Sequence, residues 1–195
     1  MTSQLSPSRF SRLVMAATLG ASVLLAGCAT QTAVDASNYG QRSEDVVAVD
    51  ETIEREVGRA LERADGRLGD ARIRPHSFNG VVLLVGQVPS EELREMAEDV
   101  IADLRGVNEV HNELTVSARL PNTQRLTDTW LTSNVISQLA TNDRIDSSKL
   151  KVTTENASVY IMGIVSREEA DRIVSVASSV GGVQRIVKVF EYIDD

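Results

Sequence analysis

The sequence is poor in the residues that form disulfides and metal cages. Its 195 residues include one cysteine and two histidines. A single cysteine cannot form a disulfide within the chain, and so few Cys and His ligands do not predict a metal site. Aromatic residues make up 4% of the chain, yet hydrophobic residues make up 42%, which is enough for packed cores. We therefore expect apolar cores, with no metal and no cofactor.

Basic residues are also in short supply. Lysine and arginine together number 20 against 28 aspartates and glutamates, so the formal net charge is −8. A protein that binds DNA or RNA needs a basic surface to neutralise phosphates. The sequence shows no such footprint, and we expect no nucleic-acid partner.

Groups arranged for catalysis are missing as well. His76 and His111 have no counterparts in the second half of the chain, and no phosphate-binding loop is present. The acidic pairs at 91–92 and 168–169 stand where helices are expected to begin, and acids there favour the helix dipole. These features predict a protein that is not an enzyme.

Long hydrophobic runs are absent apart from residues 13–26, LVMAATLGASVLLA, which follow Arg9 and Arg12. This is typical of a secretory signal and is short for a membrane span. The end of the run and the two residues after it read LAGC (residues 25–28), which resembles the lipobox of bacterial lipoproteins. The resemblance implies cleavage before Cys28 and acylation of that cysteine, each buried CH₂ adding about 0.8 kcal/mol of membrane affinity. Ala29 then implies the periplasmic face of the outer membrane; the alternative is an ordinary signal peptide with a chance cysteine.

Two repeats fill most of the remaining chain. Residues 78–114 read FNGVVLLVGQVPSEELREMAEDVIADLRGVNEVHNEL, and residues 155–190 read ENASVYIMGIVSREEADRIVSVASSVGGVQRIVKVF. Gly86 of the first corresponds to Gly163 of the second. The apolar spacing predicts helix, strand, strand, helix, strand in each copy. Glycine inside an apolar strand indicates a bulge or a close helix–strand approach, and a ligand contact is the functional alternative.

Turn and cap residues support this order of elements. Asn79-Gly80 is a strong hairpin signal because both residues tolerate positive φ, and Asn156-Ala157 takes its place in the second copy. Ser90 and Ser166 precede the second helix of each repeat as expected N-caps.

The αββαβ repeat, with an apolar strand, Gly-x-Val and a following amphipathic helix, resembles the BON domain. Two such domains behind a lipobox resemble dual-BON outer-membrane lipoproteins. The resemblance implies an α+β fold in which each three-stranded mixed sheet packs against two helices. It also implies binding of anionic phospholipid through the first helix of the second domain, gathering at division sites, and support of outer-membrane integrity and of the β-barrel assembly machinery. The expected division is signal peptide 1–27, acylated flexible tether 28–48, BON domain 49–118, linker 119–127 and BON domain 128–195.

The first helix of the second repeat has an unusual surface. Residues 128–143 read DTWLTSNVISQLATND and are charged only at their two ends, whereas residues 50–65 of the first repeat, DETIEREVGRALERAD, carry nine charges. At 100° per residue, Leu131, Val135 and Leu139 form the core stripe. The opposite side should carry charge in a solvated helix. It instead presents the candidate lipid-binding residues Trp130, Ser133, Asn134, Ile136, Ser137 and Ala140.

Such a surface needs a partner, and three are consistent with the sequence. They are the bilayer interface, another envelope protein such as the β-barrel assembly machinery, and the other domain or the linker. Tryptophan suits the bilayer interface, and an anchor at Cys28 would hold the helix close to lipid. This helix, taken from Asp128, has no lysine or arginine. Three basic residues that follow it are candidates for headgroup contact: Arg144, Lys149 and Lys151.

Overall fold

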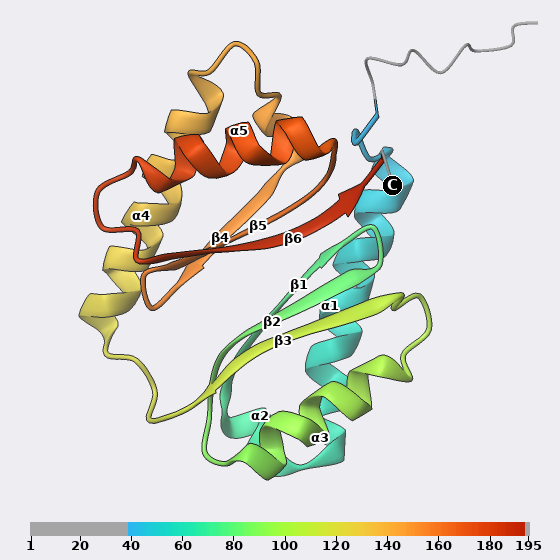
Figure 1. The fold of residues 1–195 in the computed structure, drawn as a ribbon. Coiled ribbons are helices and arrows are strands. Elements are labelled where there is room, and N and C mark those ends of the chain that lie inside the picture. Colours follow the sequence, from blue (N-terminus) through green and yellow to red (C-terminus); the bar gives the residue numbers. More distant parts are fainter. Residues whose placement is uncertain (1–38, 194–195) are drawn as a thin grey trace, which may run out of the picture. The chain divides into compact units, whose positions relative to one another are not determined.

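The computed structural model describes residues 39–193, so Cys28 and the expected signal lie outside the described part (Figure 1). The segment Ser37–Asp195 forms one compact unit. Its first repeat consists of α1 (Glu44–Ala64), α2 (Gly66–Asp70), β1 (Arg72–Phe78), β2 (Val81–Val88), α3 (Glu91–Ala102) and β3 (Glu109–Val116). Its second repeat consists of α4 (Asn122–Ala140), the 3₁₀ turn η1 (Ser147–Lys149), β4 (Lys151–Glu155), β5 (Ser158–Val165), α5 (Arg167–Ser178) and β6 (Arg185–Tyr192).

The two sheets have the same topology. In the first, β2 lies between β1, which is antiparallel to it, and β3, which is parallel to it. In the second, β5 lies in the same way between β4 and β6. Helices of each repeat cover one face of its sheet, where separate clusters of buried aliphatic side chains form the two cores. The predicted tandem αββαβ fold is confirmed.

A buried aspartate holds the hairpin turn of each repeat. Asn79 and Gly80 have φ angles of 53° and 79°, and their backbone N–H groups donate to the carboxylate of Asp50 at 2.9 and 3.0 Å. In the second repeat, Asn156 and Ala157 have φ angles of 50° and 57° and donate to Asp128 at 2.9 and 3.0 Å. Each carboxylate therefore connects the first helix of its repeat to the turn between the first two strands.

The helices that carry these aspartates begin earlier than the sequence indicated. Helix α1 begins at Glu44, within the segment assigned to the flexible tether, and α4 begins at Asn122, within the assigned linker. The other helix starts follow the prediction, since Ser90 accepts from the N–H of Leu93 and Ser166 from that of Glu169. An aspartate resembles an N-cap in sequence, but here it lies inside the helix and turns toward the sheet.

The two strand glycines make close contacts for different reasons. Gly86 has a φ of 132°, and an added Cβ would lie 1.9 Å from the carbonyl oxygen of Arg72 on the neighbouring strand. At Gly163 the nearest atom to an added Cβ is the side-chain end of Leu150, at 2.7 Å. Close packing is confirmed, but at Gly86 the neighbour is strand backbone and not the expected helix.

A third apolar cluster contains side chains from both repeats. It is formed by Phe78, Val81, Leu83, Val85, Tyr160, Met162 and Val189. Ion pairs across the repeats surround it, namely Arg72 with Glu155, Lys151 with Glu54, and Arg185 with Glu113. Strand β2 is therefore buried on both faces.

The segment from Tyr39 to Arg42, called the strap below, contacts both repeats. The Tyr39 hydroxyl donates to Glu169 of α5 at 3.3 Å, and the ammonium of Lys149 lies 4.7 Å from the centre of the tyrosine ring. At the other end, the Arg42 guanidinium lies 3.9 Å from the centre of the Phe78 ring. These residues were assigned to the flexible tether, and the structure shows them packed.

His76 on β1 is expected to make stability depend on pH. Its pKa is lowered to about 4, first by burial and then by the positive charges of Arg74 and Lys151, with Glu54 acting in the opposite direction. The unfolded chain therefore binds a proton below about pH 6.5 that the folded chain does not, and the free energy of unfolding falls as the pH falls. Between pH 6.5 and 5 we expect a loss of about 1.5 kcal/mol, measured by urea denaturation. Replacing His76 with glutamine should remove this component, and an unchanged pH slope in that variant contradicts the assignment.

Candidate functional site

Helix α4 turns a weakly polar surface to the solvent. Three large hydrophobic side chains are exposed on it, Leu126 by 70%, Trp130 by 60% and Ile136 by 44%. Leu126 lies one turn before Trp130, so the two side chains are neighbours on the helix. The opposite stripe is buried, as the sequence predicted, with Leu131, Val135 and Leu139 at 1% exposure or less.

The other predicted site residues lie on or beside the same surface. At 100° per residue, Ser133, Ser137 and Ala140 fall within about 40° of Leu126, and all three are exposed. Asn134 lies at the border and is partly buried. We call the surface formed by Leu126, Trp130, Ser133, Ile136, Ser137 and Ala140 the α4 face.

A shallow groove runs along one side of the α4 face. It has a volume of about 480 Å³, and Trp130, Asn134 and Ser137 line it together with the loop that follows α5. Val180 and Gly181 come from that loop. The structure thus brings three of the predicted residues to one groove, whose other wall the sequence analysis did not include.

The hydroxyl groups of α4 are largely satisfied by the helix itself. Thr129 donates to the carbonyl of Arg125 at 2.9 Å, and Ser133 donates to that of Thr129 at 3.1 Å. Thr127 and Thr132 make the same bond to the carbonyl four residues earlier. A hydroxyl that already has a partner costs less to remove from water. Helix α4 is therefore less polar than its serine and threonine content suggests, and Ser133 of the α4 face is one of the satisfied groups.

Charge on α4 is limited to two residues. Asp128 is 3% exposed, and its carboxylate accepts hydrogen bonds from the backbone N–H groups of the β4–β5 turn. Arg125 is exposed. The expectation of a helix without a basic residue was therefore wrong, because α4 begins six residues before Asp128 and includes Arg125.

The three predicted headgroup contacts differ in their surroundings. Arg144 is exposed. Lys149 is 7% exposed and lies against the ring of Tyr39, and the ammonium of Lys151 pairs with Glu54 of the first repeat. Only Arg144 of the three is placed to meet a ligand at the surface.

The sequence analysis missed Leu126 and Arg125 because it placed them in the linker. Leu126 lies four residues before Trp130 and eight before Asn134, which is helical spacing, and this signal could have found it. Pro121 supplied a second signal, because proline is common at helix starts. The structure has Pro121 as the N-cap residue.

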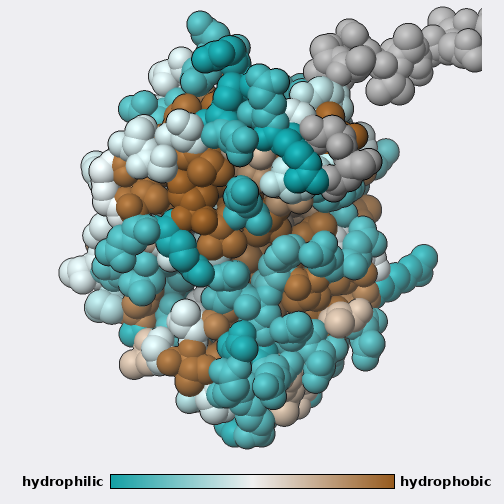
Figure 2. Space-filling view, in the orientation of Figure 1, coloured by the Kyte–Doolittle hydropathy of each residue, from teal (hydrophilic) through white to brown (hydrophobic). Residues whose placement is uncertain are grey.

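The surface drawn in Figure 2 mixes separate hydrophobic patches with hydrophilic areas. Its left edge, where Figure 1 places α4, is largely pale, the colour of intermediate hydropathy. In the part of the chain that the structure describes, no helix is long and apolar enough to cross a membrane. Within the same residues, no group of His, Cys, Asp and Glu side chains could hold a metal ion.

Comparison with known proteins agrees with the tandem repeat. The family model described as "BON domain" matches residues 49–118 and 127–194. "Outer membrane lipoprotein DolP" of Haemophilus influenzae is 35% identical over 190 residues, which cover 92% of this chain and 96% of that protein. The "21 kDa hemolysin" of Actinobacillus pleuropneumoniae is 34% identical over 152 residues, 78% of each chain.

Among solved structures, the C-terminal domain of CdsD, the structural protein of the type III secretion system of Chlamydia trachomatis, is 10% identical. The match covers 69% of this chain and 96% of that one with a TM-score of 0.30, too low to support an argument. The DolP relative confirms the prediction of an outer-membrane lipoprotein. With two BON matches that together span more than half of its length, the chain belongs to the BON-domain family and has the dual-BON arrangement of a DolP-like protein.

Proposed function

We propose that the protein binds phospholipid at the periplasmic face of the outer membrane through the α4 face. The observation that carries this proposal is the exposure of Leu126, Trp130 and Ile136 on a helix surface whose only exposed charge is Arg125. Exposed apolar groups gathered on one surface mark a site of association. BON domains of the DolP type are not a family of enzymes, so a binding role is the one to test.

The chemistry of the α4 face suits the interface of a bilayer. The indole of Trp130 combines an apolar ring with a polar N–H, which is the reason that tryptophan gathers at membrane interfaces. Burying the three large side chains contributes on the order of 5 kcal/mol by area, an upper value. The hydroxyls of Ser133 on the α4 face and Thr129 beside it oppose this little, since both already donate to helix carbonyls.

The membrane anchor makes weak intrinsic affinity sufficient. Acylation at Cys28, which lies outside the described residues, holds the folded unit near lipid, so contact of the α4 face becomes an intramolecular event. Arg125 at the start of α4 and Arg144 after its end are the exposed basic groups for an anionic headgroup. This supports a preference for anionic lipid that is modest in a chain of net charge −8.

Trp130 gives a direct test because it is the only tryptophan in the chain. Unacylated protein comprising residues 37–195 is mixed with vesicles of phosphatidylglycerol and phosphatidylethanolamine, and indole fluorescence is recorded. We expect a blue shift of the emission and co-sedimentation with the vesicles. Leu126→Glu should weaken binding at least about tenfold, because a charge must then be buried at the interface.

The matched control is Val49→Glu, which places the same charge on an exposed valine of α1 that is 55% accessible. It should bind vesicles as the parent protein does. Equal loss in the two variants, or no emission shift with any vesicle, refutes the lipid role. Capture of an envelope protein such as the β-barrel assembly machinery that depends on Trp130 would then favour the adaptor function, for which the groove beside Trp130 offers a surface.

A further inference from the structure

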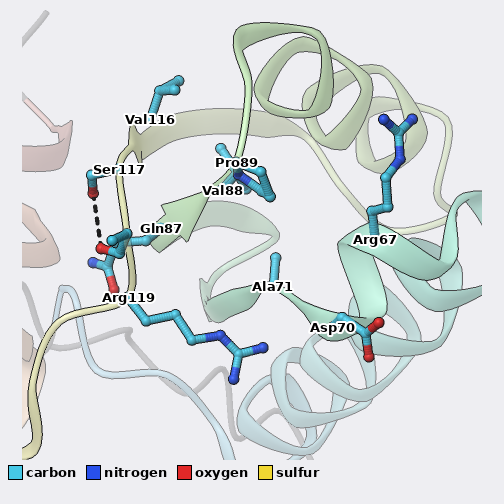
Figure 3. A pocket seen from close by; sticks show the side chains of 10 residues that line it. Arg67, Asp70, Ala71, Gln87, Val88, Pro89, Val116, Ser117 and Arg119 are labelled. Carbon is cyan, nitrogen blue, oxygen red and sulfur yellow. Dashed lines mark hydrogen bonds between the residues drawn. The ribbon is translucent and has the colours of Figure 1, made fainter.

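A cavity in the first repeat is lined by residues other than those of the α4 face. It has a volume of about 640 Å³ and opens at the ends of β2 and β3, beside α2 (Figure 3). Ala71, Val88, Pro89 and Val116 supply an apolar lining. Val116 is 47% exposed, a large value for a valine at the end of a strand. We call this cavity the strand-end groove.

The corresponding end of the second sheet is covered by the chain itself. Because Gly86 corresponds to Gly163, the groove residues Gln87 and Pro89 correspond to Ile164 and Ser166. The strap packs at these two positions. A Cβ added to Gly40 would lie 2.5 Å from the carbonyl oxygen of Ile164, and the Tyr39 hydroxyl interacts with Ser166.

The strap shows which chemistry this end of a BON sheet accepts. Tyr39 places its ring beneath the ammonium of Lys149 and donates its hydroxyl to Glu169 at the start of the following helix. Gly40 then lets the backbone approach the strand end closely, with a φ of 81°. A turn with an aromatic residue followed by glycine therefore fits the second repeat. In the first repeat the linker residue Leu120 bonds Gln87 instead, and Pro89, the counterpart of Ser166, stays exposed.

The charges at the strand-end groove indicate the sign of an occupant. Arg67, Arg119 and Asp70 are the charged residues that line it. The guanidinium of Arg67 already pairs with Asp65 and Glu92, so exposed Arg119 is the cation that can meet an occupant. In Figure 3 the side chain of Arg119 extends from the end of β3 toward the α2 side of the groove. A guanidinium favours a carboxylate, which it can bind through two parallel N–H groups.

From these observations we infer that the strand-end groove binds a short acidic peptide segment of a partner protein. An aromatic or aliphatic side chain of the peptide lies over the exposed Pro89 and Val116, and a carboxylate of the peptide pairs with Arg119. This peptide site is separate from the α4 face and does not depend on lipid binding.

The test uses the full chain in detergent and a fluorescein-labelled peptide of sequence EDYGDE, followed by fluorescence anisotropy. The peptide copies the Tyr-Gly pair of the strap and adds carboxylates. We expect saturable binding that weakens with added salt, because screening reduces the attraction between charges. The counterpart QNYGNQ, which has the same shape without the carboxylates, should bind at least about tenfold more weakly.

Two variants and two controls locate the site. Arg119→Glu should lower the affinity for EDYGDE at least about tenfold, and Val116→Asp should lower it as well, because each places a like charge against the peptide. Arg105→Glu makes the same charge change on an exposed arginine outside the groove and should leave the affinity within about twofold. Trp130→Glu should also leave it unchanged, which separates this site from the lipid role. Absence of binding, equal binding of QNYGNQ, or equal loss in the Arg105 and Arg119 variants overturns the inference.

Discussion

Replacing Asp50 with alanine is expected to lower the free energy of unfolding by about 4 kcal/mol. The carboxylate is 2% exposed and accepts from the hydroxyl of Ser77 at 2.7 Å, from the two N–H groups of the hairpin turn, and from Arg42 at 2.6 Å. Alanine leaves these donors buried without a partner, and each such group costs about 1–3 kcal/mol. Urea denaturation followed by circular dichroism measures the loss, and hydrogen exchange at the N–H of Gly80 reports it locally.

The neighbouring substitution Glu51→Ala is the control, because it removes the same charge from an exposed position of the same helix. It should change the free energy of unfolding by less than about 0.5 kcal/mol. If both variants unfold at the same urea concentration, the Asp50 carboxylate does not hold the turn.

The same carboxylate adds a pH dependence at the acid end. Burial by itself raises the pKa of Asp50, but hydrogen bonds from the turn, Ser77 and Arg42 outweigh it, so the pKa lies below its usual value of 3.8. The folded chain keeps the carboxylate ionised at a pH where the unfolded chain binds a proton. This contribution to stability is therefore present above about pH 4 and is lost as the pH falls through the pKa that Asp50 has in the folded chain. The Asp50→Ala protein should lack it.

Gly86→Ala is expected to be the most damaging small substitution, lowering stability by about 3 kcal/mol or more. The added Cβ meets the carbonyl of Arg72 at 1.9 Å, and the φ of 132° is one that side chains rarely permit. Both effects act at the centre of the first repeat, so β1 and β2 must separate to relieve them. Thermal and urea denaturation of the variant measure the cost.

The chain provides two matched comparisons for this prediction. Gly163→Ala should cost less than Gly86→Ala, because its nearest contact is the flexible end of Leu150 and its φ is not positive. Gly58→Ala should raise stability by about 0.5–1 kcal/mol, since it lies within α1 and an added Cβ meets nothing within 4 Å. Equal destabilisation at positions 86 and 163 would show that the strand backbone contact is not the cause.

Repeat symmetry made most of the fold predictable from the sequence. The hairpin turns, the N-cap serines and the core stripe of α4 follow from local rules, since φ preference, capping and helical period are properties of a few adjacent residues. The helix starts did not, because the pattern that the two copies share begins at Asp50 and Asp128, inside the helices. Their carboxylates instead bind turns 28 to 30 residues away, and only the folded chain brings those groups together.

The candidate site was predictable only in part for the same reason. Trp130 and Ile136 stood out because charge was missing around them, whereas Leu126 was assigned to a linker. The contact of Lys149 with Tyr39 of the strap and the pairing of Lys151 with Glu54 join distant segments of the chain, and the pattern of the second repeat alone does not contain them. The packing of the strap could not be predicted from the sequence either, because the residues that Tyr39 contacts lie 110 to 130 positions further along the chain.

If Cys28 carries the lipid, as the lipobox predicts, the strap also limits how far the folded unit can stand from the bilayer. A flexible tether that ended at residue 48 would allow about 70 Å of reach, but with Tyr39 packed against α5 only eleven Cα steps separate it from Cys28. Fully stretched, they span roughly 40 Å. An acylated Cys28 would therefore hold the Tyr39 end of the folded unit within roughly 40 Å of the bilayer, and loosening the Tyr39 contact would extend this reach without changing a single binding residue.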